Sequence, residues 1–374
     1  MQEARKAEGK KGSAASVRPS SARDTVCDWV RLIATVYVVI GHSAYLTMSS
    51  VYGGVAWELP EQVHPLYNST VFTWFRWLSG WVYGFHMPLF FMLSGAVLAL
   101  KALPDFDTFT RSKAKRLLFP YFVWGWCFMF PVKRLGGYYD SHTVLLAMKS
   151  FLSGGESGHL WFLTALFWCQ IVFCLLYKGL RRAGIKSGYL LLLCAGSIQL
   201  LGKTFIPADF DLLGMRTGLT YVFYFAAGYQ FRCMRRSHEK WDTRKTVSVL
   251  ILIFCIECLN YNLWTEILDG FFLVLAGSFF TFLLANLCSR FLPGVQGSRA
   301  WQFVIRNLFY VYLVHDPLEY IILRFTMRFN LLLNAGGCVL YLLMRTAGVF
   351  LAGLCMGELI RKGRGCLRSN SPDR

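Results

Sequence analysis

The chain has 374 residues, of which 55% are hydrophobic and only 16% are charged. Soluble domains usually carry about 25% charged residues, so this composition excludes an ordinary soluble enzyme. The formal net charge of +18 is strongly basic, but the basic residues lie between apolar runs and near the two chain ends. That distribution is typical of membrane proteins and not of a nucleic-acid-binding surface. We therefore expect membrane lipid around the protein and no nucleic-acid partner.

The apolar runs predict an all-α, polytopic membrane helix bundle of about ten transmembrane helices. A helix needs about 20 apolar residues to cross a bilayer, and runs of roughly this length recur along the chain. In chain order, the predicted spans are 28–48, 71–100, 116–132, 159–178, 187–202, 215–231, 246–264, 270–289, 303–325 and 333–360.

The loops between these spans predict the orientation of the chain. Loops rich in Lys and Arg alternate with acidic or weakly charged loops, so that ten helices put the strongly basic loops on one side. Because basic loops stay in the cytoplasm, both termini are predicted to be cytoplasmic. We expect a cell membrane, most simply the bacterial cytoplasmic membrane. The predicted organisation is a disordered basic head at 1–25, a transmembrane domain at 26–361 and a short basic tail at 362–374.

The first span carries two ionisable residues in an apolar setting, Arg31 and His42. They are eleven residues apart, which is almost three helical turns, so both lie on one stripe of the helix about 16 Å apart. Arg31 could be a snorkelling anchor at the cytoplasmic interface, and His42 could form an interhelical hydrogen bond near the bilayer centre. Two intramembrane ionisable residues on one stripe also favour a functional site.

Three further ionisable residues, His86, Glu257 and His315, fall within the second, seventh and ninth spans. Burial disfavours the charged imidazolium, so a buried histidine is expected to be a neutral base. Beside a polar partner, such a base can take a proton from a hydroxyl group. Each of the three residues could equally have a purely structural role.

The loop before the third span concentrates positive charge at the mouth of a helix. It contains Arg111, Lys113, Lys115 and Arg116 within the run RSKAKR. Four cations at a helix entrance could bind phosphate groups. They could also be the ordinary basic flank of a cytoplasmic loop, and composition leaves both interpretations open.

Together these residues resemble the acyltransferase family 3 of integral membrane proteins, over about residues 25–360. The similar elements are a basic residue and a histidine separated by ten residues, an HMPLFF stretch ending in Ser-Gly, an RxxR variant, a Trp-Phe-Leu helix start and a late Tyr-Leu-x-His. In this chain they are Arg31 with His42, His86–Gly95, Lys113–Arg116, Trp161–Leu163 and Tyr312–His315. At Lys113, a lysine replaces the first arginine of RxxR, which exchanges a planar fork for a point charge.

The resemblance implies a membrane O-acyltransferase that uses cytoplasmic acetyl-CoA as its acyl donor and no metal. The acceptor would be a hydroxyl of a cell-surface glycan, a lipid-linked sugar or a similar molecule. The residues expected to bind the CoA phosphates are Arg31, Arg111, Lys113 and Arg116. The catalytic candidates, with the first as general base, are His42, Arg31, His86, Glu257 and His315.

Two other functions stay open. A transporter or exporter of a small polar molecule would also carry His and Glu residues near the membrane midplane. The chain could instead be the non-catalytic membrane half of a split enzyme. Release of free CoA from acetyl-CoA in the presence of an acceptor would separate an acyltransferase from both.

Overall fold

A computed structural model of the chain describes the backbone of residues 24–44, 50–56, 58–237, 243–263 and 271–369. It also describes their side chains, except at 235–237, 257–263 and 365–369. The described residues form no strand. They include an isolated β-bridge between Gly53 and Tyr139. The all-α prediction is therefore confirmed.

The described helices follow one another with short connections. The α-helices are α1 (Thr25–Ser43), α2 (Thr70–Leu98), α3 (Phe106–Lys113), α4 (Phe119–Trp124), α5 (Phe130–Leu135), α6 (Val144–Ser153), α7 (Trp161–Arg182), α8 (Gly188–Phe205), α9 (Met215–Thr220), α10 (Val222–Ser237), α11 (Thr243–Leu263), α12 (Phe271–Phe291), α13 (Pro293–Gly297), α14 (Arg299–Arg328), α15 (Ala335–Leu343) and α16 (Val349–Ser369). The 3-10 turns are η1 (Pro65–Asn68), η4 (Gly158–Leu160), η5 (Leu212–Gly214) and η6 (Leu331–Leu333). The π-helical turns η2 (Ala114–Leu118), η3 (Gly125–Met129) and η7 (Met344–Gly348) join α3 to α4, α4 to α5 and α15 to α16.

Six described segments are long and apolar enough to cross a membrane, namely Thr25–Ser43, Thr70–Leu98, Val144–Arg182, Gly188–Phe205, Phe271–Phe291 and Ala335–Arg364. The chain is therefore a polytopic membrane protein. The other four predicted spans are also mostly helical over their described residues. The total of about ten crossings stays a prediction.

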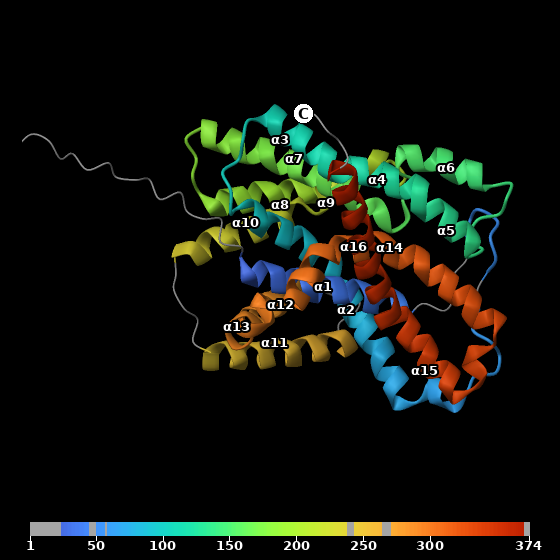
Figure 1. The fold of residues 1–374 in the computed structure, drawn as a ribbon. Helices are drawn as coiled ribbons and strands as arrows, with labels where there is room; N and C mark the ends of the chain where they lie inside the picture. Colours follow the sequence, from blue (N-terminus) through green and yellow to red (C-terminus); the bar gives the residue numbers. More distant parts are fainter. Residues whose placement is uncertain (1–23, 45–49, 57, 238–242, 264–270, 370–374) are drawn as a thin grey trace, which may run out of the picture.

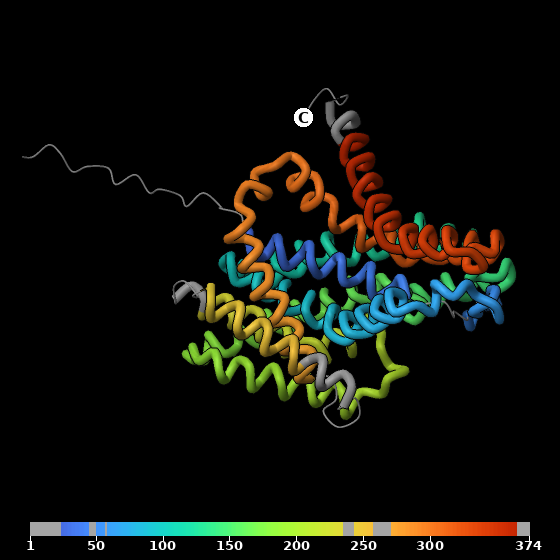
Figure 2. The backbone as a smooth tube through the Cα atoms, turned by 90° about the horizontal axis from the view of Figure 1, so that it is seen from below, coloured from blue at the N-terminus to red at the C-terminus, as the bar shows by residue number. Residues whose placement is uncertain are grey.

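Several helix ends that carry basic residues lie at one end of the bundle. The start of α1, the turn between α7 and α8, and α13 lie at the same end of the bundle, at the left in Figures 1 and 2. The basic stretches around residues 181–186 and 290–306 therefore lie toward the same end of the bundle, as a positive-inside arrangement requires. The orientation of the chain stays a prediction. Most of the predicted head, 1–23, lies outside the described residues, and α16 extends to Ser369 within the predicted tail.

α1 runs through the middle of the bundle in both views (Figures 1 and 2). It packs against α2, α12 and α14, and buries Val30 and Ala34 completely. The start of α1 is fixed by Asp24, whose side chain accepts a hydrogen bond from the backbone N–H of Cys27 at 3.1 Å. Asp24 also forms an ion pair with Arg232 of α10. The N-terminal end of α1, which precedes Arg31 and His42, is thus anchored to α10.

α2 and α10 approach closely because glycines lie at their contact. A Cβ atom at Gly95 would overlap the carbonyl oxygen of Phe225, and one at Gly228 would overlap the carbonyl oxygen of Met92. Small residues commonly allow this close approach of membrane helices. α10 packs in turn on α7 and α8, so α2 connects the central α1 to that group.

The orientation can be tested with a protease site inserted after Gly184, between α7 and α8, or after Ser141, in the turn before α6. In sealed inside-out vesicles, the site after Gly184 should be cleaved and the site after Ser141 should be protected. Right-side-out vesicles supply the control, because they should give the opposite pattern. Cleavage after Ser141 in inside-out vesicles would reverse the orientation.

Candidate active site

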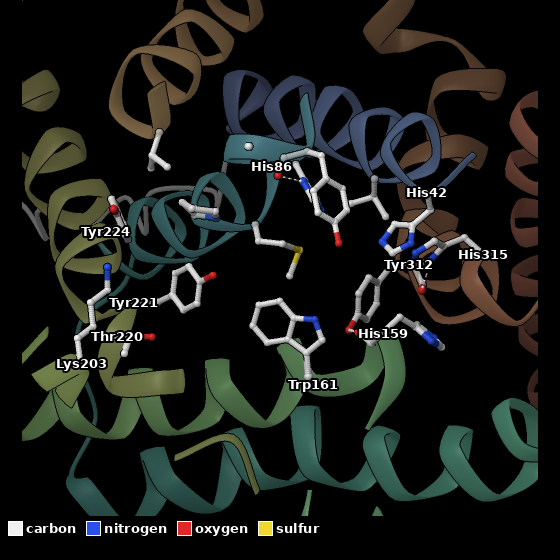
Figure 3. A pocket seen from close by; sticks show the side chains of 16 residues that line it. His42, His86, His159, Trp161, Lys203, Thr220, Tyr221, Tyr224, Tyr312 and His315 are labelled. Carbon is white, nitrogen blue, oxygen red and sulfur yellow. Dashed lines mark hydrogen bonds between the residues drawn. The ribbon is translucent and has the colours of Figure 1, made fainter. Parts of the chain in front are cut away.

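Three of the predicted catalytic residues line one cavity. His42 in the last turn of α1, His86 on α2 and His315 on α14 border a space of about 390 Å³ (Figure 3). The ring centroid of His42 lies 4.8 Å from that of His315 and 6.4 Å from that of His86. We call this space the histidine cavity. Its further lining is largely aromatic and includes Tyr83, Trp161, Tyr221, Tyr224 and Tyr312.

The hydrogen bonds of His86 and His315 determine which ring nitrogen can accept a proton. Nδ1 of His86 lies 3.2 Å from the carbonyl oxygen of Val82 and 3.0 Å from that of Tyr83. Nδ1 of His315 lies 2.7 Å from the carbonyl oxygen of Tyr312. Because a carbonyl oxygen only accepts, each Nδ1 carries the hydrogen and each Nε2 of the neutral ring carries the lone pair. Nε2 of His315 is buried without a hydrogen-bond partner among the described residues, so it is an open acceptor.

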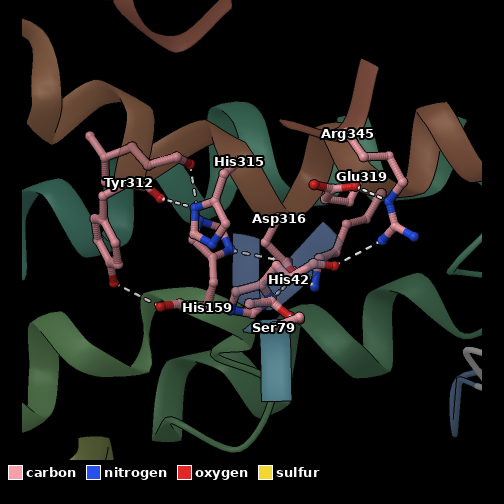
Figure 4. Close-up of polar contacts among 11 residues, drawn as sticks. His42, Ser79, His159, Tyr312, His315, Asp316, Glu319 and Arg345 are labelled. Carbon is pink, nitrogen blue, oxygen red and sulfur yellow. Dashed lines mark hydrogen bonds and ion pairs between the residues drawn. The ribbon is translucent and has the colours of Figure 1, made fainter. Parts of the chain in front are cut away.

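Asp316, the neighbour of His315 in the chain, is the centre of the polar contacts (Figure 4). Its Oδ2 lies 2.9 Å from Nζ of Lys133 and 3.2 Å from Nδ1 of His159. Its Oδ1 lies 3.8 Å from Nδ1 of His42, which is longer than a hydrogen bond but remains a close electrostatic contact. The Nδ1 edge of the His42 ring therefore faces this carboxylate, and the ring also borders the histidine cavity.

Lys133 on α5 supplies the main counter-charge to this carboxylate. The lysine is 2% exposed, and its ammonium lies 4.8 and 4.7 Å from the ring centroids of Tyr138 and Tyr320. Gly158 allows the approach, since its φ of +49° suits glycine and a Cβ there would lie 3.0 Å from the lysine Nζ. A buried carboxylate is stable only with such partners. Across the described residues, no group of three or more His, Cys, Asp or Glu side chains is arranged to hold a metal ion.

Pro317 explains why His159 reaches α14. Proline has no backbone N–H, so the carbonyl group of Leu313, four residues earlier, lacks its helical donor. Nε2 of His159 lies 2.9 Å from that oxygen and donates to it. In turn, the hydroxyl of Tyr312 donates to the backbone carbonyl of His159 at 2.7 Å. These two bonds join η4 to α14 and fix the ring of His159 beside Asp316.

The last carbonyl groups of α1 lack helical donors and are bound by side chains from other elements. The hydroxyl of Ser79 on α2 donates to the carbonyl oxygens of Ile40 and Gly41, at 3.0 and 3.1 Å. Nη2 of Arg345, in the π-helical turn η7, donates to the carbonyl oxygen of His42 at 2.9 Å. The backbone of His42 is thereby attached to both α2 and η7.

Arg345 is itself part of a buried ion pair. Its Nε contacts the carboxylate of Glu319 on α14, and its Nη1 donates to the hydroxyl of Tyr341 (Figure 4). Arg345 is 0% exposed and Glu319 is 1% exposed, so water cannot replace either partner. The pair connects η7 to α14 and, through the His42 carbonyl, to α1.

A second cavity, of about 510 Å³, lies among basic side chains. We call it the basic cavity, and its cationic lining consists of Arg31, Lys101, Lys113, Arg116 and Arg306. No Asp or Glu occurs among the described residues that line it. It thus collects three of the four residues predicted to bind phosphates. The fourth, Arg111, is exposed on α3 and lies outside the lining.

The crowding of these cations affects Lys113, which precedes the third predicted span. Burial lowers the pKa of Lys113 to about 8, with further contributions from the charges of Arg116 and Lys101. An anion in the basic cavity would reduce the repulsion among these groups. The basic cavity is therefore electrostatically complementary to phosphate.

The two cavities share one lining residue. Tyr312 lines both the histidine cavity and the basic cavity. Trp161 lies on the histidine side, and Phe162, whose ring centroid is 5.8 Å from that of Tyr312, lies on the basic side. Arg31 and His42, eleven residues apart on α1, therefore border different cavities along the same helix.

Comparison with known proteins agrees with this architecture. The family model described as "Acyltransferase domain" matches residues 26–355. The chain belongs to the acyltransferase family 3. Together with the six apolar segments, this match makes the protein a membrane protein of that family.

A similar curated protein is the nodulation protein NolL of Sinorhizobium fredii. It is 24% identical to this chain over 246 residues, which cover 65% of this chain and 58% of that protein. The chain thus matches somewhat more than half the length of this relative. No solved structure matches the chain.

Much of the polar centre around Asp316 is not predicted from the sequence. The residues missed are Lys133, His159, Asp316, Glu319 and Arg345. Asp316, Glu319 and Arg345 lie inside predicted spans, so the rule that selects His42 would also have selected them. Lys133 and His159 lie at the ends of spans, where polar residues are ordinary. The side chain of the predicted residue Glu257 lies outside the described residues.

Removing one member of the Arg345–Glu319 pair should destabilise the protein. Arg345→Met and Glu319→Met each leave a buried charge without its partner, which usually costs about 3–5 kcal/mol. The double variant removes both charges and should lose less stability than the sum of the single losses. Thermal unfolding of the purified protein in detergent would measure these differences.

The matched control is Arg361→Met on α16. Arg361 and Glu358 are 4.0 Å apart and their side chains are 35% and 24% exposed. Loss of this exposed pair should cost less than about 1 kcal/mol. Strictly additive losses in the Arg345→Met/Glu319→Met double variant would contradict a coupled buried pair.

Proposed function

We propose that the protein transfers an acyl group, most simply acetyl, from cytoplasmic acyl-CoA to a hydroxyl group of a glycan, a lipid-linked sugar or a similar acceptor. The observation that carries this proposal is that the basic cavity and the histidine cavity share Tyr312 as a lining residue. One cavity suits the charged part of the donor, and the other contains the bases that the reaction needs. The cell membrane, most simply the bacterial cytoplasmic membrane, is the proposed location.

The donor fits the basic cavity by charge. Its phosphates would be bound by the five cations of the lining, with the planar forks of Arg31, Arg116 and Arg306 suited to bidentate contacts. The thin pantetheine arm would extend along α1, past Phe162 and toward Tyr312. The thioester would then reach the boundary with the histidine cavity while the phosphates stay near the cytoplasmic end.

The acyl transfer itself requires a base at the acceptor hydroxyl. The imidazole of His42 takes the hydroxyl proton while the acceptor oxygen attacks the thioester carbon. The resulting tetrahedral intermediate expels the CoA thiolate by breaking the C–S bond, and the thiolate takes the proton from His42. Asp316 stabilises the imidazolium form of His42 through the 3.8 Å contact at Nδ1.

His315 and His86 have a different proposed role. Each presents the unprotonated Nε2 of a neutral ring, because each Nδ1 is hydrogen-bonded to the backbone of its own helix. These nitrogens can accept hydrogen bonds from acceptor hydroxyl groups and orient the reacting one. Orientation by His315 would also give its buried Nε2 the partner that it lacks among the described residues.

Donor binding should weaken when the basic cavity loses charge. Arg116→Ala should weaken CoA binding by about 1.5–3 kcal/mol, the range for a hydrogen bond to a charged group. CoA affinity should also fall from about pH 7 to pH 9, because the pKa of Lys113 is about 8 and phosphate binds the protonated form. Calorimetric titration of the purified protein with CoA would measure both effects.

Two variants control the donor experiment. Lys113→Arg keeps its charge throughout this pH range and should remove most of the pH dependence. Arg182→Ala removes a cation at the end of α7, outside the lining, and should leave CoA affinity unchanged. If folded Arg116→Ala binds CoA as tightly as the parent protein, the basic loop is a topology signal and not a phosphate-binding site.

Proton transfer by His42 predicts a separate effect on turnover. His42→Ala should lower the rate of acyl transfer by about 10²- to 10⁴-fold, the usual contribution of general base catalysis. CoA affinity should barely change, because Arg31 lies about 16 Å away along α1. Acyl transfer from acetyl-CoA, measured as free CoA release, and CoA titration together report the two effects.

The control for this variant is His142→Ala, at an exposed histidine that lines neither cavity. Its turnover should equal that of the parent protein. A structural role of His42 would instead lower thermal stability, CoA binding and turnover together. The proposed mechanism is wrong if folded His42→Ala transfers acyl groups at close to the parental rate.

A further inference from the structure

Lys203 on α8 contributes a positive charge to the histidine cavity, at the opposite end from His42 (Figure 3). Among the described residues that line this cavity, Lys203 is the one Lys or Arg, and no Asp or Glu accompanies it. The reacting end and the charged end of the cavity are therefore separate places, bordered by different helices.

The charge of Lys203 is not used by the fold. Lys203 forms no ion pair or hydrogen bond with any described residue. A topology signal does not explain Lys203 either, because it lies near the end of α8 opposite to the basic turn that contains Arg181 and Lys186.

The wall between these two ends suits a sugar ring. Trp161 and Tyr221 lie between Lys203 and the histidines in Figure 3 and have ring centroids 5.9 Å apart. Tyr221 is held by stacking on Phe91, with ring centroids 4.4 Å apart and an interplanar angle of 4°. Aromatic faces pack against the C–H faces of sugars, and the hydroxyl of Thr220 adds a hydrogen-bonding group near Lys203.

We infer that the acceptor is an anionic saccharide, with its carboxylate or phosphate bound by Lys203 while one of its hydroxyl groups reaches His42. This inference rests on the proposed function, because only acyl transfer makes the bound saccharide an acceptor. Binding of the saccharide at Lys203 requires no donor. The volume of about 390 Å³ is near the lower end of the range for small-molecule sites, so the bound part is a terminal sugar and not a long chain.

The test compares sugars that differ in charge, with the purified full chain in nanodiscs and without donor. Methyl β-D-glucuronide and methyl β-D-glucoside form one pair, and glucose 6-phosphate and glucose form the other. Binding is followed by the change in tryptophan fluorescence, since Trp161 lines the cavity. The anionic member should bind about fivefold more tightly, the upper value for an exposed ion pair, and added salt should reduce the difference.

Variants of Lys203 test whether this side chain causes the preference for anionic sugars. Lys203→Gln should abolish it, Lys203→Glu should reverse it and Lys203→Arg should keep it. Lys149→Gln, at an exposed lysine of α6 that lines neither cavity, should behave as the parent protein. A preference limited to the glucuronide or to glucose 6-phosphate would identify the anion as a carboxylate or a phosphate.

Three results would overturn the inference: equal binding of charged and neutral sugars, a preference that survives in Lys203→Gln, or no binding of any of the four sugars. Acyl transfer from acetyl-CoA to the same sugars is measured separately. Charge preference in binding without any acyl transfer would count against the proposed function and leave the anionic site intact. Acyl transfer to charged and neutral sugars with equal efficiency would support the proposed function and count against the anionic site.

Discussion

A buried carboxylate inside a helical bundle is stable only if the fold brings positive or hydrogen-bonding partners to it, and Asp316 has this position. Lys133, His159 and His42 reach it from α5, η4 and α1, three elements that are far apart in the sequence. Packing of these elements and the chemistry of the centre therefore depend on each other. Displacing any one element would leave a charge or a ring nitrogen in the interior without its partner. The same requirement holds for Arg345, whose ion pair and backbone contact connect η7, α14 and α1.

The two cavities divide the work of the proposed reaction by charge. Moving phosphate groups into the bundle would carry a large desolvation cost. An arrangement in which the phosphates stay among five cations, and only a thin neutral arm passes Tyr312, avoids that cost. α1 provides the length scale, because Arg31 borders one cavity and His42 borders the other. In the proposed reaction, the spacing of the two residues would correspond to the distance between the bound and the reacting parts of one donor.

Several features could be predicted from the sequence, each for a local reason. Apolar composition and span length predicted helices and a membrane setting, because backbone groups in lipid must be satisfied within the same segment. The rule that intramembrane ionisable residues mark sites selected His42, His86 and His315, which do border one cavity. The cationic run before the third span supplied Lys113 and Arg116 of the basic cavity.

The sequence by itself determined that this chain is a membrane helix bundle with ionisable residues at particular helical positions, since composition and period are properties of single segments. Only the tertiary structure decided which of those residues meet. Lys133 and His159 look like ordinary residues at the ends of spans until α5 and η4 pack beside α14. The meeting of His159 with α14 also requires the carbonyl that Pro317 leaves without a donor. Such contacts depend on the register and crossing of neighbouring helices, and no single segment encodes these relations.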